Sequence, residues 1–292
     1  MDEVRISKKT HTETVLLIVL TALLLLTLAV PIFLLRNTGE EKDPEDVPAW
    51  PTCAPNPLAP DAFTYDENGY LITAAQTALP GIDVSSHQGQ IDWAQVKDAG
   101  FRFVMIRVGG RYFGEDSELY TDDLAQENYR GAKEAGLLVG AYFFSQATNV
   151  RQAQEEAQFA LSLTENWEMD LPLVCDWESV RDTYPTGQVD RKTLTACLDA
   201  FCRCVEAAGR DAMVYFNPST AGNRFFPEKL SRYGGWLAMY NSRMEYPYEV
   251  TMWQYTDAGC VPGISGGTDL DLYFPESGKT AGKIAPETDA KS

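Results

Sequence analysis

One repeated unit between residues 80 and 275 limits the folds that this chain can adopt. An amphipathic helical segment, the dipeptide Ala-Gly and an apolar run follow one another in WAQVKDAG-FRFVMIRVG, in YRGAKEAG-LLVGAYFFS and in CRCVEAAG-RDAMVYFN. Gly100, Gly136 and Gly209 stand where the end of a helix favours a residue in the left-handed conformation. Because the apolar runs have no polar face and alternate with helices, they indicate parallel strands buried beneath helices.

Toward the carboxyl terminus the strand candidates follow one another with shorter helical segments between them. A fourth apolar run, LPLVCDWE, still follows a helical segment, whereas GGWLAMYN, VTMWQYT and TDLDLYF come with little helix between them. With GIDVS included, the chain has about eight strand candidates, the number that closes a (β/α) barrel. We therefore predict an α/β fold, a modified TIM-like (β/α) barrel whose helices are reduced in the C-terminal part.

The N-terminal segment predicts a membrane anchor ahead of the barrel. Residues 15–35, VLLIVLTALLLLTLAVPIFLL, are uncharged and long enough to cross a bilayer as a transmembrane helix. Basic residues precede this run and acidic residues dominate after it, which places residues 1–14 in the cytoplasm and the rest of the chain outside the cell. A cleaved signal peptide, and hence a secreted protein, is the alternative. The long apolar run without a small-x-small cleavage site favours the anchor.

Four further segments follow the predicted anchor. Residues 36–62 are rich in proline and acid, as expected for a solvated stalk. Residues 63–79 contain Asn68-Gly69 between aromatic and β-branched residues, which predicts a β-hairpin. The predicted barrel then spans 80–275, and residues 276–292 form a polar tail.

The charge and the cysteines argue against two classes of function. The formal net charge of -18 disfavours a nucleic-acid partner, because phosphate binding requires Lys and Arg. The 6 cysteines contain no CxxC pair and no zinc-type spacing with histidine, so we expect no metal cluster. An oxidising exterior would permit a disulfide, for which Cys53 and Cys260 are one possible pair.

Polar and aromatic side chains gather where the predicted strands end. In barrels of this kind the catalytic groups lie at the carboxyl ends of the strands. Those ends hold, in chain order, Asp83, Arg107, Tyr142, Asp176, Glu178, Asn217, Tyr240, Trp253, Gln254, Asp269 and Asp271. The set is strongly acidic.

Asp176 and Glu178 form a pair within this set. They are two residues apart at the end of a predicted strand, so both carboxylates leave the same face. Like charge and partial burial raise the pKa of at least one of them, so that one group stays protonated and can act as an acid beside a charged neighbour. Glycosidic bond cleavage needs this division of roles, and aromatic rings nearby could hold sugar faces. Helix capping or pairing with an arginine is the structural alternative for such acids.

The stretch GIDVSSHQGQIDWAQVKDAGFRFVMIRVG at 81–109 resembles the opening of the family 25 glycoside hydrolases, the muramidase-type lysozymes. The resemblance continues through GAYFF, LVCDWE, MVYFN, GWLAMYN, MWQYT and GISGGTDLDLY, and it covers roughly residues 80–275 in order. It implies a modified eight-stranded barrel that cleaves the β-1,4 bond between N-acetylmuramic acid and N-acetylglucosamine in peptidoglycan. It implies no metal or organic cofactor.

The resemblance also implies roles for single residues. Glu178 matches the general acid, and Asp176 matches the acid two residues before it. Asp83 matches the acid of the first strand, Asp269 that of the last, and Tyr142 an aromatic hydroxyl beside the reacting sugar. The remaining strand-end candidates for substrate binding are Arg107, Asn217, Tyr240, Trp253 and Gln254.

The family is described as retaining, and two routes stay open for Asp176. It acts either as the nucleophile or as the group that orients and stabilises the substrate's own N-acetyl oxygen. The sequence does not separate these routes, because side-chain rotamers shift the carboxyl separation by more than the difference between them. Phe143 and Asp271 stand where His and Asn are common in the family, which bears on substrate preference rather than on the reaction.

Two other functions are compatible with the same barrel. One is a peptidoglycan-binding module that keeps the groove but has lost turnover, against which the intact acids argue. The other is a hydrolase of a different acetamido glycan. The leading prediction is a membrane-anchored muramidase that acts on the wall of its own cell.

Overall fold

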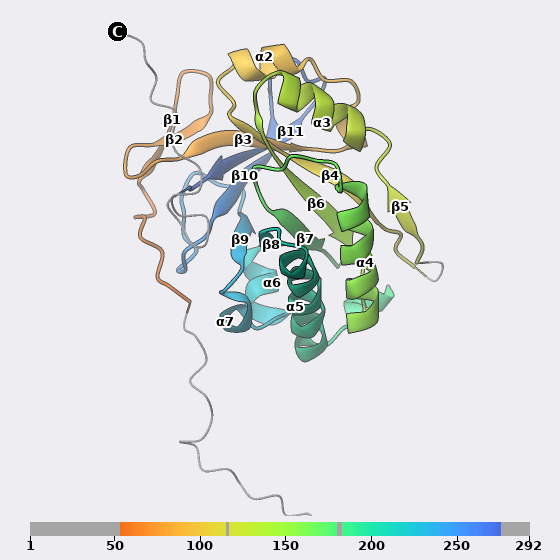
Figure 1. The fold of residues 1–292 in the computed structure, drawn as a ribbon. Coiled ribbons are helices and arrows are strands. Elements are labelled where there is room, and N and C mark those ends of the chain that lie inside the picture. The colour runs from red at the N-terminus through yellow and green to blue at the C-terminus, as the bar shows by residue number, and fades with distance from the viewer. Residues whose placement is uncertain (1–52, 115–116, 180–182, 276–292) are drawn as a thin grey trace, which may run out of the picture. The chain divides into compact units, whose positions relative to one another are not determined.

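The computed structural model describes residues 53–114, 117–179 and 183–275, and its centre is a closed β-barrel (Figure 1). The barrel strands are β3 (Leu79–Val84), β4 (Phe103–Arg111), β6 (Leu138–Ser145), β7 (Leu173–Trp177), β8 (Ala212–Phe216), β9 (Gly234–Ala238), β10 (Met252–Gly259) and β11 (Thr268–Tyr273). Neighbouring strands pair in the order β3-β11-β10-β9-β8-β7-β6-β4, and β3 also pairs with β4, which closes the ring. The predicted barrel of about eight strands is confirmed.

Helices cover the first half of the barrel and become short in the second half, as predicted. α2 (Trp93–Asp98) has 6 residues, and α3 (Ala125–Glu134), α4 (Val150–Leu163) and α5 (Arg191–Ala207) have 10, 14 and 17. After β8 the chain forms only α6 (Pro218–Asn223) and α7 (Pro227–Leu230), with 6 and 4 residues. The glycine after the last turn of α2, α3 and α5 has a left-handed φ of 97°, 73° and 78°, at Gly100, Gly136 and Gly209. The Ala-Gly dipeptides therefore end helices in the way that the repeated unit predicts.

Strand β11 runs in the opposite direction to its two neighbours. It pairs antiparallel with β10 and with β3, whereas β9 and β10 are still parallel. The parallel arrangement that the repeated unit predicts therefore ends at β10. The physical reason is the short connection from β10 to β11, which contains no helix and can join only antiparallel strands. As a result the beginning of β11, not its end, lies at the rim where the other strands finish.

A β-hairpin takes the place of a helix over the outer face of β10. It consists of β1 (Phe63–Tyr65) and β2 (Leu71–Thr73), which pair antiparallel. The ring of Phe63 contacts that of Trp253 edge to face at 4.9 Å, and the first N–H of β2 donates to the Tyr255 hydroxyl. Trp253 is fully buried. The hairpin thus supplies the apolar cover that this part of the barrel would otherwise lack.

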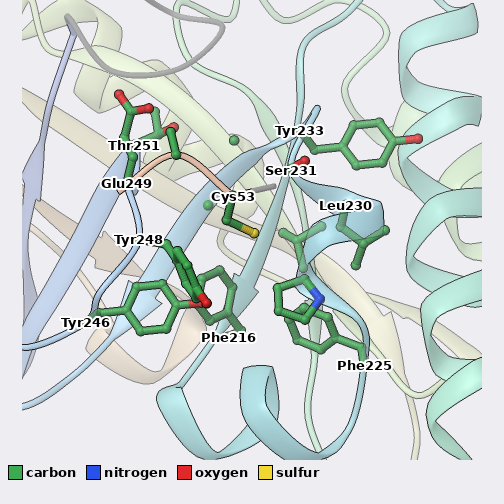
Figure 2. Close-up of a pocket in the computed structure, with 15 residues that line it drawn as sticks. Cys53, Phe216, Phe225, Leu230, Ser231, Tyr233, Tyr246, Tyr248, Glu249 and Thr251 are labelled. Carbon is green, nitrogen blue, oxygen red and sulfur yellow. The ribbon is translucent and has the colours of Figure 1, made fainter. Parts of the chain in front are cut away.

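The described chain begins with a segment that is fastened to the outside of the barrel. The N–H of Asn56 donates to the carbonyl of Pro247 at 2.9 Å, and the N–H of Glu249 donates to the carbonyl of Ala54 at 2.8 Å. Figure 2 shows the outer cavity beside this segment, where the Cys53 side chain lies among aromatic and aliphatic side chains. This outer cavity shares no lining residue with the acidic cavity described below.

The expected disulfide is absent, and the predicted anchor is untested. All six cysteines are free, and Cys53 and Cys260 are therefore not bonded to each other. Among the residues that the structure describes, no helix combines the length and apolarity that a membrane crossing requires. Residues 15–35, the first part of the stalk and the tail 276–292 lie outside the described residues.

Gly81 in β3 provides a test of how tightly the barrel interior is packed. A Cβ atom at this position would lie 2.2 Å from the ring of Phe103. We expect Gly81→Ala to lower the free energy of unfolding by about 1–3 kcal/mol, because the ring has to leave its preferred position. Urea denaturation measures the change.

Gly222→Ala in α6 is the matched control. A Cβ atom there meets nothing within 4 Å. It should leave the free energy of unfolding unchanged or raise it by less than about 1 kcal/mol. Equal stability of the two variants would contradict a packed interior.

Candidate active site

A cavity of about 210 Å³ opens at the rim where the parallel barrel strands end. We call it the acidic cavity. Side chains that face the barrel interior reach this rim from β3, β4, β6, β7, β8, β9, β10 and β11. Its lining residues are Asp83, Arg107, Tyr142, Phe144, Asp176, Glu178, Tyr215, Trp236, Tyr240, Gln254 and Asp269.

Strand β7 carries two of the acids, Asp176 near its end and Glu178 just beyond it. Asp176 is buried and its Oδ1 has no hydrogen-bond partner. Burial and the neighbouring carboxyl of Glu178 hold the pKa of Asp176 well above its usual range. Glu178 is exposed at the mouth as a whole residue, yet desolvation of its carboxyl still raises its pKa. The two carboxyls therefore retain a proton between them at a pH where isolated acids have lost theirs.

Asp83 at the end of β3 is held by a network of neutral donors. Gln254 Nε2 donates to Asp83 Oδ2 at 2.7 Å, and Gln254 Oε1 accepts hydrogen bonds from the hydroxyls of Tyr215 and Tyr240 at 2.9 and 3.1 Å. Burial, followed by the charges of Asp269 and Asp271, raises the pKa of Asp83 well above its usual range. The glutamine thus fixes the position of this acid without neutralising it.

Strand β11 brings two further acids to the same place. Asp269 lies directly opposite Asp83 in the antiparallel register. Burial raises the pKa of Asp269 to about 6. Asp271 is completely buried beneath the cavity, where the indole Nε1 of Trp236 donates to its Oδ1 at 2.8 Å. Burial holds the pKa of Asp271 well above its usual range, although the indole hydrogen bond lowers it.

Arg107 is the one basic side chain among the described residues that line the acidic cavity. Its guanidinium pairs with the buried Asp122, with a shortest contact of 2.7 Å, and donates to Ser86 Oγ at 3.2 Å. Asp122 in turn accepts from the N–H of Ser86 and caps the turn before α3. Because the carboxylate of Asp122 already neutralises part of the positive charge of Arg107, the arginine only partly offsets the negative charge of the acids in the cavity.

The structure brings most of the predicted site residues together. The acids Asp83, Asp176, Glu178 and Asp269 line the acidic cavity, as do Arg107, Tyr142, Tyr240 and Gln254. The hydroxyl of Tyr142 lies close enough to the acids that burial and the charge of Asp83 raise its pKa well above the usual range.

Two predicted substrate-binding residues lie elsewhere. Trp253 faces outward from β10, because side chains alternate along a strand and its neighbour Gln254 faces inward. Its indole donates to the carbonyl of Met239 beneath the hairpin. Asn217 is exposed at the start of α6, where its side chain accepts from the N–H of Thr220 at 2.9 Å. Asn217 thus caps a helix and is not part of the cavity lining.

The sequence reasoning missed Tyr215, Trp236 and Phe144 in the lining. Alternation along a strand gives a signal for all three, since Phe144 lies two residues after the predicted Tyr142 on β6. Tyr215 lies two residues before Asn217 and two after Met213, and strict alternation along β8 puts it on the inner face. Trp236 is likewise inward-facing within GGWLA. Both omissions arose because a single residue was taken at each strand end, Asn217 after β8 and Tyr240 after β9, whereas inward-facing residues earlier in the same strands also reach the cavity.

A buried ion pair supports the cavity from the side of α4. Glu156 is completely buried and accepts from Arg111 Nε at 2.7 Å, from the Ser145 hydroxyl and from the N–H of Gln146. Gln146 Nε2 donates to the carbonyl of Glu178 at 2.7 Å. The end of β6 is therefore tied both to α4 and to the residue after β7.

This fold and site define a class of protein. Carboxyl groups with raised pKa values face one another across a cavity lined with aromatic rings, which is the arrangement that glycoside hydrolysis requires. Among the described residues, no group of three or more His, Cys, Asp or Glu side chains has the geometry to hold a metal ion. The site has the chemical groups that an acid-dependent glycoside hydrolase requires.

Comparison with known proteins identifies the family. Residues 82–264 match the family described as Glycosyl hydrolases family 25. Over 210 residues the chain is 29% identical to Lysozyme M1 of Streptomyces globisporus, an alignment that covers 68% of this chain and 69% of that protein. The structure resembles a bacterial lysozyme from Streptomyces coelicolor with a TM-score of 0.56 and 25% identity, covering 68% of this chain and 92% of the other.

A third similarity is to the modular autolysin LytC from Streptococcus pneumoniae, which has also been solved with a synthetic peptidoglycan ligand. The TM-score is 0.61 at 23% identity, and the match covers 73% of this chain and 50% of LytC. At this identity the match shows a shared fold alone. Because the family match at 82–264 spans more than half of the sequence, the chain belongs to glycosyl hydrolases family 25. It is a glycoside hydrolase.

Asp269 gives a prediction about stability and pH. Its pKa of about 6 in the folded chain exceeds the ordinary value of 3.8, so the folded state keeps a proton that the unfolded state loses between these two values. The wild type therefore loses stability as the pH rises through this window. Asn cannot ionise, so Asp269→Asn should be more stable than the wild type above pH 6. The gain should be about 1–2 kcal/mol, less than the full shift because the side chain is partly exposed to solvent.

Urea denaturation at several pH values measures this gain, which should vanish below a pH of about 3.8. Asp98→Asn on the exposed face of α2 is the control for replacing an acid by an amide. A gain that is the same at acidic and neutral pH would show that the carboxyl of Asp269 does not titrate abnormally.

Proposed function

We propose that this chain is a muramidase that cleaves the β-1,4 bond between N-acetylmuramic acid and N-acetylglucosamine in peptidoglycan. The observation that carries the proposal is the pair of neighbouring carboxyls Asp176 and Glu178, both with raised pKa values, which line the acidic cavity of a family 25 member together with Asp83 and Asp269. The similarity to Lysozyme M1 supports the same substrate class.

Glu178 is the proposed general acid. It lies at the mouth of the cavity, where a glycosidic oxygen can reach it, and its raised pKa favours the protonated form. The proton passes from the Glu178 carboxyl to the leaving oxygen as the glycosidic bond breaks, and water then enters with Glu178 as the base. The overall reaction in this proposal proceeds with retention.

Asp176 is the proposed stabiliser of the substrate's N-acetyl group, and the direct nucleophile is the alternative role. Its buried Oδ1 has no partner and can accept a hydrogen bond from the N–H of an acetamido group. Such a bond favours the ionised form of Asp176 and so moves the shared proton toward Glu178. Substrate binding would then leave Glu178 protonated and ready to act as the general acid. The acetamido oxygen attacks the anomeric carbon as Glu178 protonates the leaving oxygen.

The remaining residues hold the sugar and the acids in place. Asp269, which ionises above a pH of about 6, adds negative potential near the developing positive charge, Asp83 lies opposite it, and Tyr142 offers a hydroxyl beside them. Arg107, Tyr240 and Gln254 are the proposed polar contacts to the substrate. Trp253 and Asn217 have no part in this proposal, because they lie outside the cavity.

The test is cleavage of purified peptidoglycan by the full chain and by Glu178→Gln. The variant keeps the size of the side chain but has no proton to transfer, so we expect the rate of reducing-end release to fall by about 100-fold or more. Glu165→Gln, at an exposed position, is the matched control and should keep the wild-type rate.

The product decides which bond is cut. N-acetylmuramic acid at the new reducing end agrees with the proposal, whereas N-acetylglucosamine there would refute it. Equal rates for wild type and Glu178→Gln would instead favour a peptidoglycan-binding module without turnover.

We also propose that residues 15–35 anchor the enzyme in the cell membrane, with the barrel outside. The support is the uncharged apolar run, which is long enough to cross a bilayer. The full chain should stay in the membrane fraction after a carbonate wash and keep its complete mass of 32.4 kDa. Replacing Leu24 and Leu25 together by arginine should release it, because each charge costs about 2.5–3.5 kcal/mol at the centre of a membrane helix. A shortened protein in the medium would show that the segment is a cleaved signal peptide.

A further inference from the structure

Asp83 and Asp271 meet at the floor of the acidic cavity. In the antiparallel register of β3 and β11, Asp83 lies opposite Asp269 and Asp271 lies opposite Gly81. Asp271 is therefore the diagonal neighbour of Asp83 on the inner face of this strand pair, and Gly81 has no side chain that could separate the two. Their carboxyls lie within hydrogen-bonding distance of each other.

The contact between these carboxyls requires a proton, because ionised carboxylates only accept hydrogen bonds and repel each other. Asp83 accepts from the amide of Gln254, and Asp271 Oδ1 accepts from the indole of Trp236. Asp271 Oδ2 accepts no hydrogen bond from an N–H or O–H group in the part of the chain that the structure describes. The two residues are 4% and 0% exposed, so solvent screens their repulsion poorly.

We propose that Asp271 is a positioning residue, which shares one proton with Asp83 and so holds Asp83 in place at the floor of the acidic cavity. The Asp83 carboxyl keeps the proton and donates it to Asp271, whose Oδ1 accepts from the Trp236 indole. The pair then carries a single negative charge, and each carboxyl is also fixed by a neutral donor. The inference rests on the proposed function for the substrate that this site meets.

The surroundings of the pair favour retention of the shared proton. Burial raises the pKa of both carboxyls most, and their mutual contact raises the pKa of Asp83 further while lowering that of Asp271. Arg107 on β4 is the one cation among the described residues that line the cavity, and Asp122 already pairs with it. The other titratable groups that face the pair are Asp269 on β11, Tyr142 on β6, Tyr215 on β8, Tyr240 after β9 and Tyr255 on β10.

A shared proton makes the position of Asp83 depend on pH. When the pair loses the proton at higher pH, two negative charges are left in contact and Asp83 moves away from Asp271. An amide at position 271 can donate to the Asp83 carboxylate at every pH. Asp271→Asn therefore keeps the size of the side chain and the contact, but removes the need for the proton.

Counting protons tests the pair without any measurement of cleavage. Urea denaturation of the full chain between about pH 5 and 7, where unfolded carboxyls are ionised, gives the number of protons that only the folded state holds. Asp271→Asn and Asp83→Asn should each hold about one proton fewer than the wild type. Their folding equilibrium constant should then fall about tenfold less per pH unit. The double variant should also hold about one proton fewer, because the pair has only one to lose.

The control and the contrary outcomes are equally definite. Asp98→Asn, at an exposed position of α2, should keep the wild-type number of protons. A loss of two protons in the double variant would mean that each acid holds its own, and no loss in Asp271→Asn would mean that Asp83 holds the proton alone. Either result overturns the shared pair. Infrared absorption of protonated carboxyls in the folded chain gives the same count without unfolding.

Cleavage of peptidoglycan tests the positioning role. Dividing kcat/KM of Asp271→Asn by that of the wild type removes the titration of Glu178, which both proteins share. Between about pH 5 and 9 this ratio should rise, approaching tenfold per pH unit where the pair loses its proton. A ratio that is constant with pH would show a structural role alone and overturn the positioning. If the wild type fails to cleave but the proton counts agree, the muramidase proposal fails and the carboxyl pair stands.

Discussion

Closure of the barrel is the constraint on which the site depends. When eight strands form a ring, their inward-facing side chains must share one narrow interior, and at the rim several of these side chains are acids. Below them lies an apolar layer that includes Phe103, Met105, Val174 and Met213. This layer keeps water away from the lower side of the carboxyls. Crowding and desolvation therefore act together, and both favour the protonated form.

The way in which these acids are held preserves their raised pKa values. Neutral donors do most of the positioning: the Gln254 amide holds Asp83, and the Trp236 indole holds Asp271. A cation in either place would have lowered the pKa far more than an amide or an indole does. Arg107 is the exception, and it is paired with Asp122, so part of its charge is already compensated. The site thus gains fixed geometry while the pKa values of its carboxyls stay above their usual range.

Much of this arrangement follows from local patterns in the sequence, and the parts that do not follow have identifiable causes. The Ala-Gly helix ends, the buried strands and the acids at strand ends are local features, and the structure contains them. The direction of β11 depends on a short connection that must close a ring, which a strand pattern does not reveal. The pairing of Asp269 with Asp83 depends on that direction. Trp253 could have been assigned to the outer face by alternation, but its partner Phe63 comes from a hairpin that is distant in the sequence.

Two buried acids, Glu156 and Asp176, differ in how completely the protein satisfies their hydrogen bonds. Glu156 has both oxygens engaged, by Arg111, by the N–H of Gln146 and by the Ser145 hydroxyl, so it has no capacity left for a ligand. Asp176 has an oxygen without any hydrogen-bond partner although its side chain is also buried. A buried acceptor that no protein group satisfies costs stability, and such a cost is explained when a ligand supplies the missing donor. The backbone carbonyl of Glu178, held by Gln146, links the two sites. The fully satisfied acid therefore fixes the position of the strand end that carries the unsatisfied one, which is the acid proposed to meet the substrate.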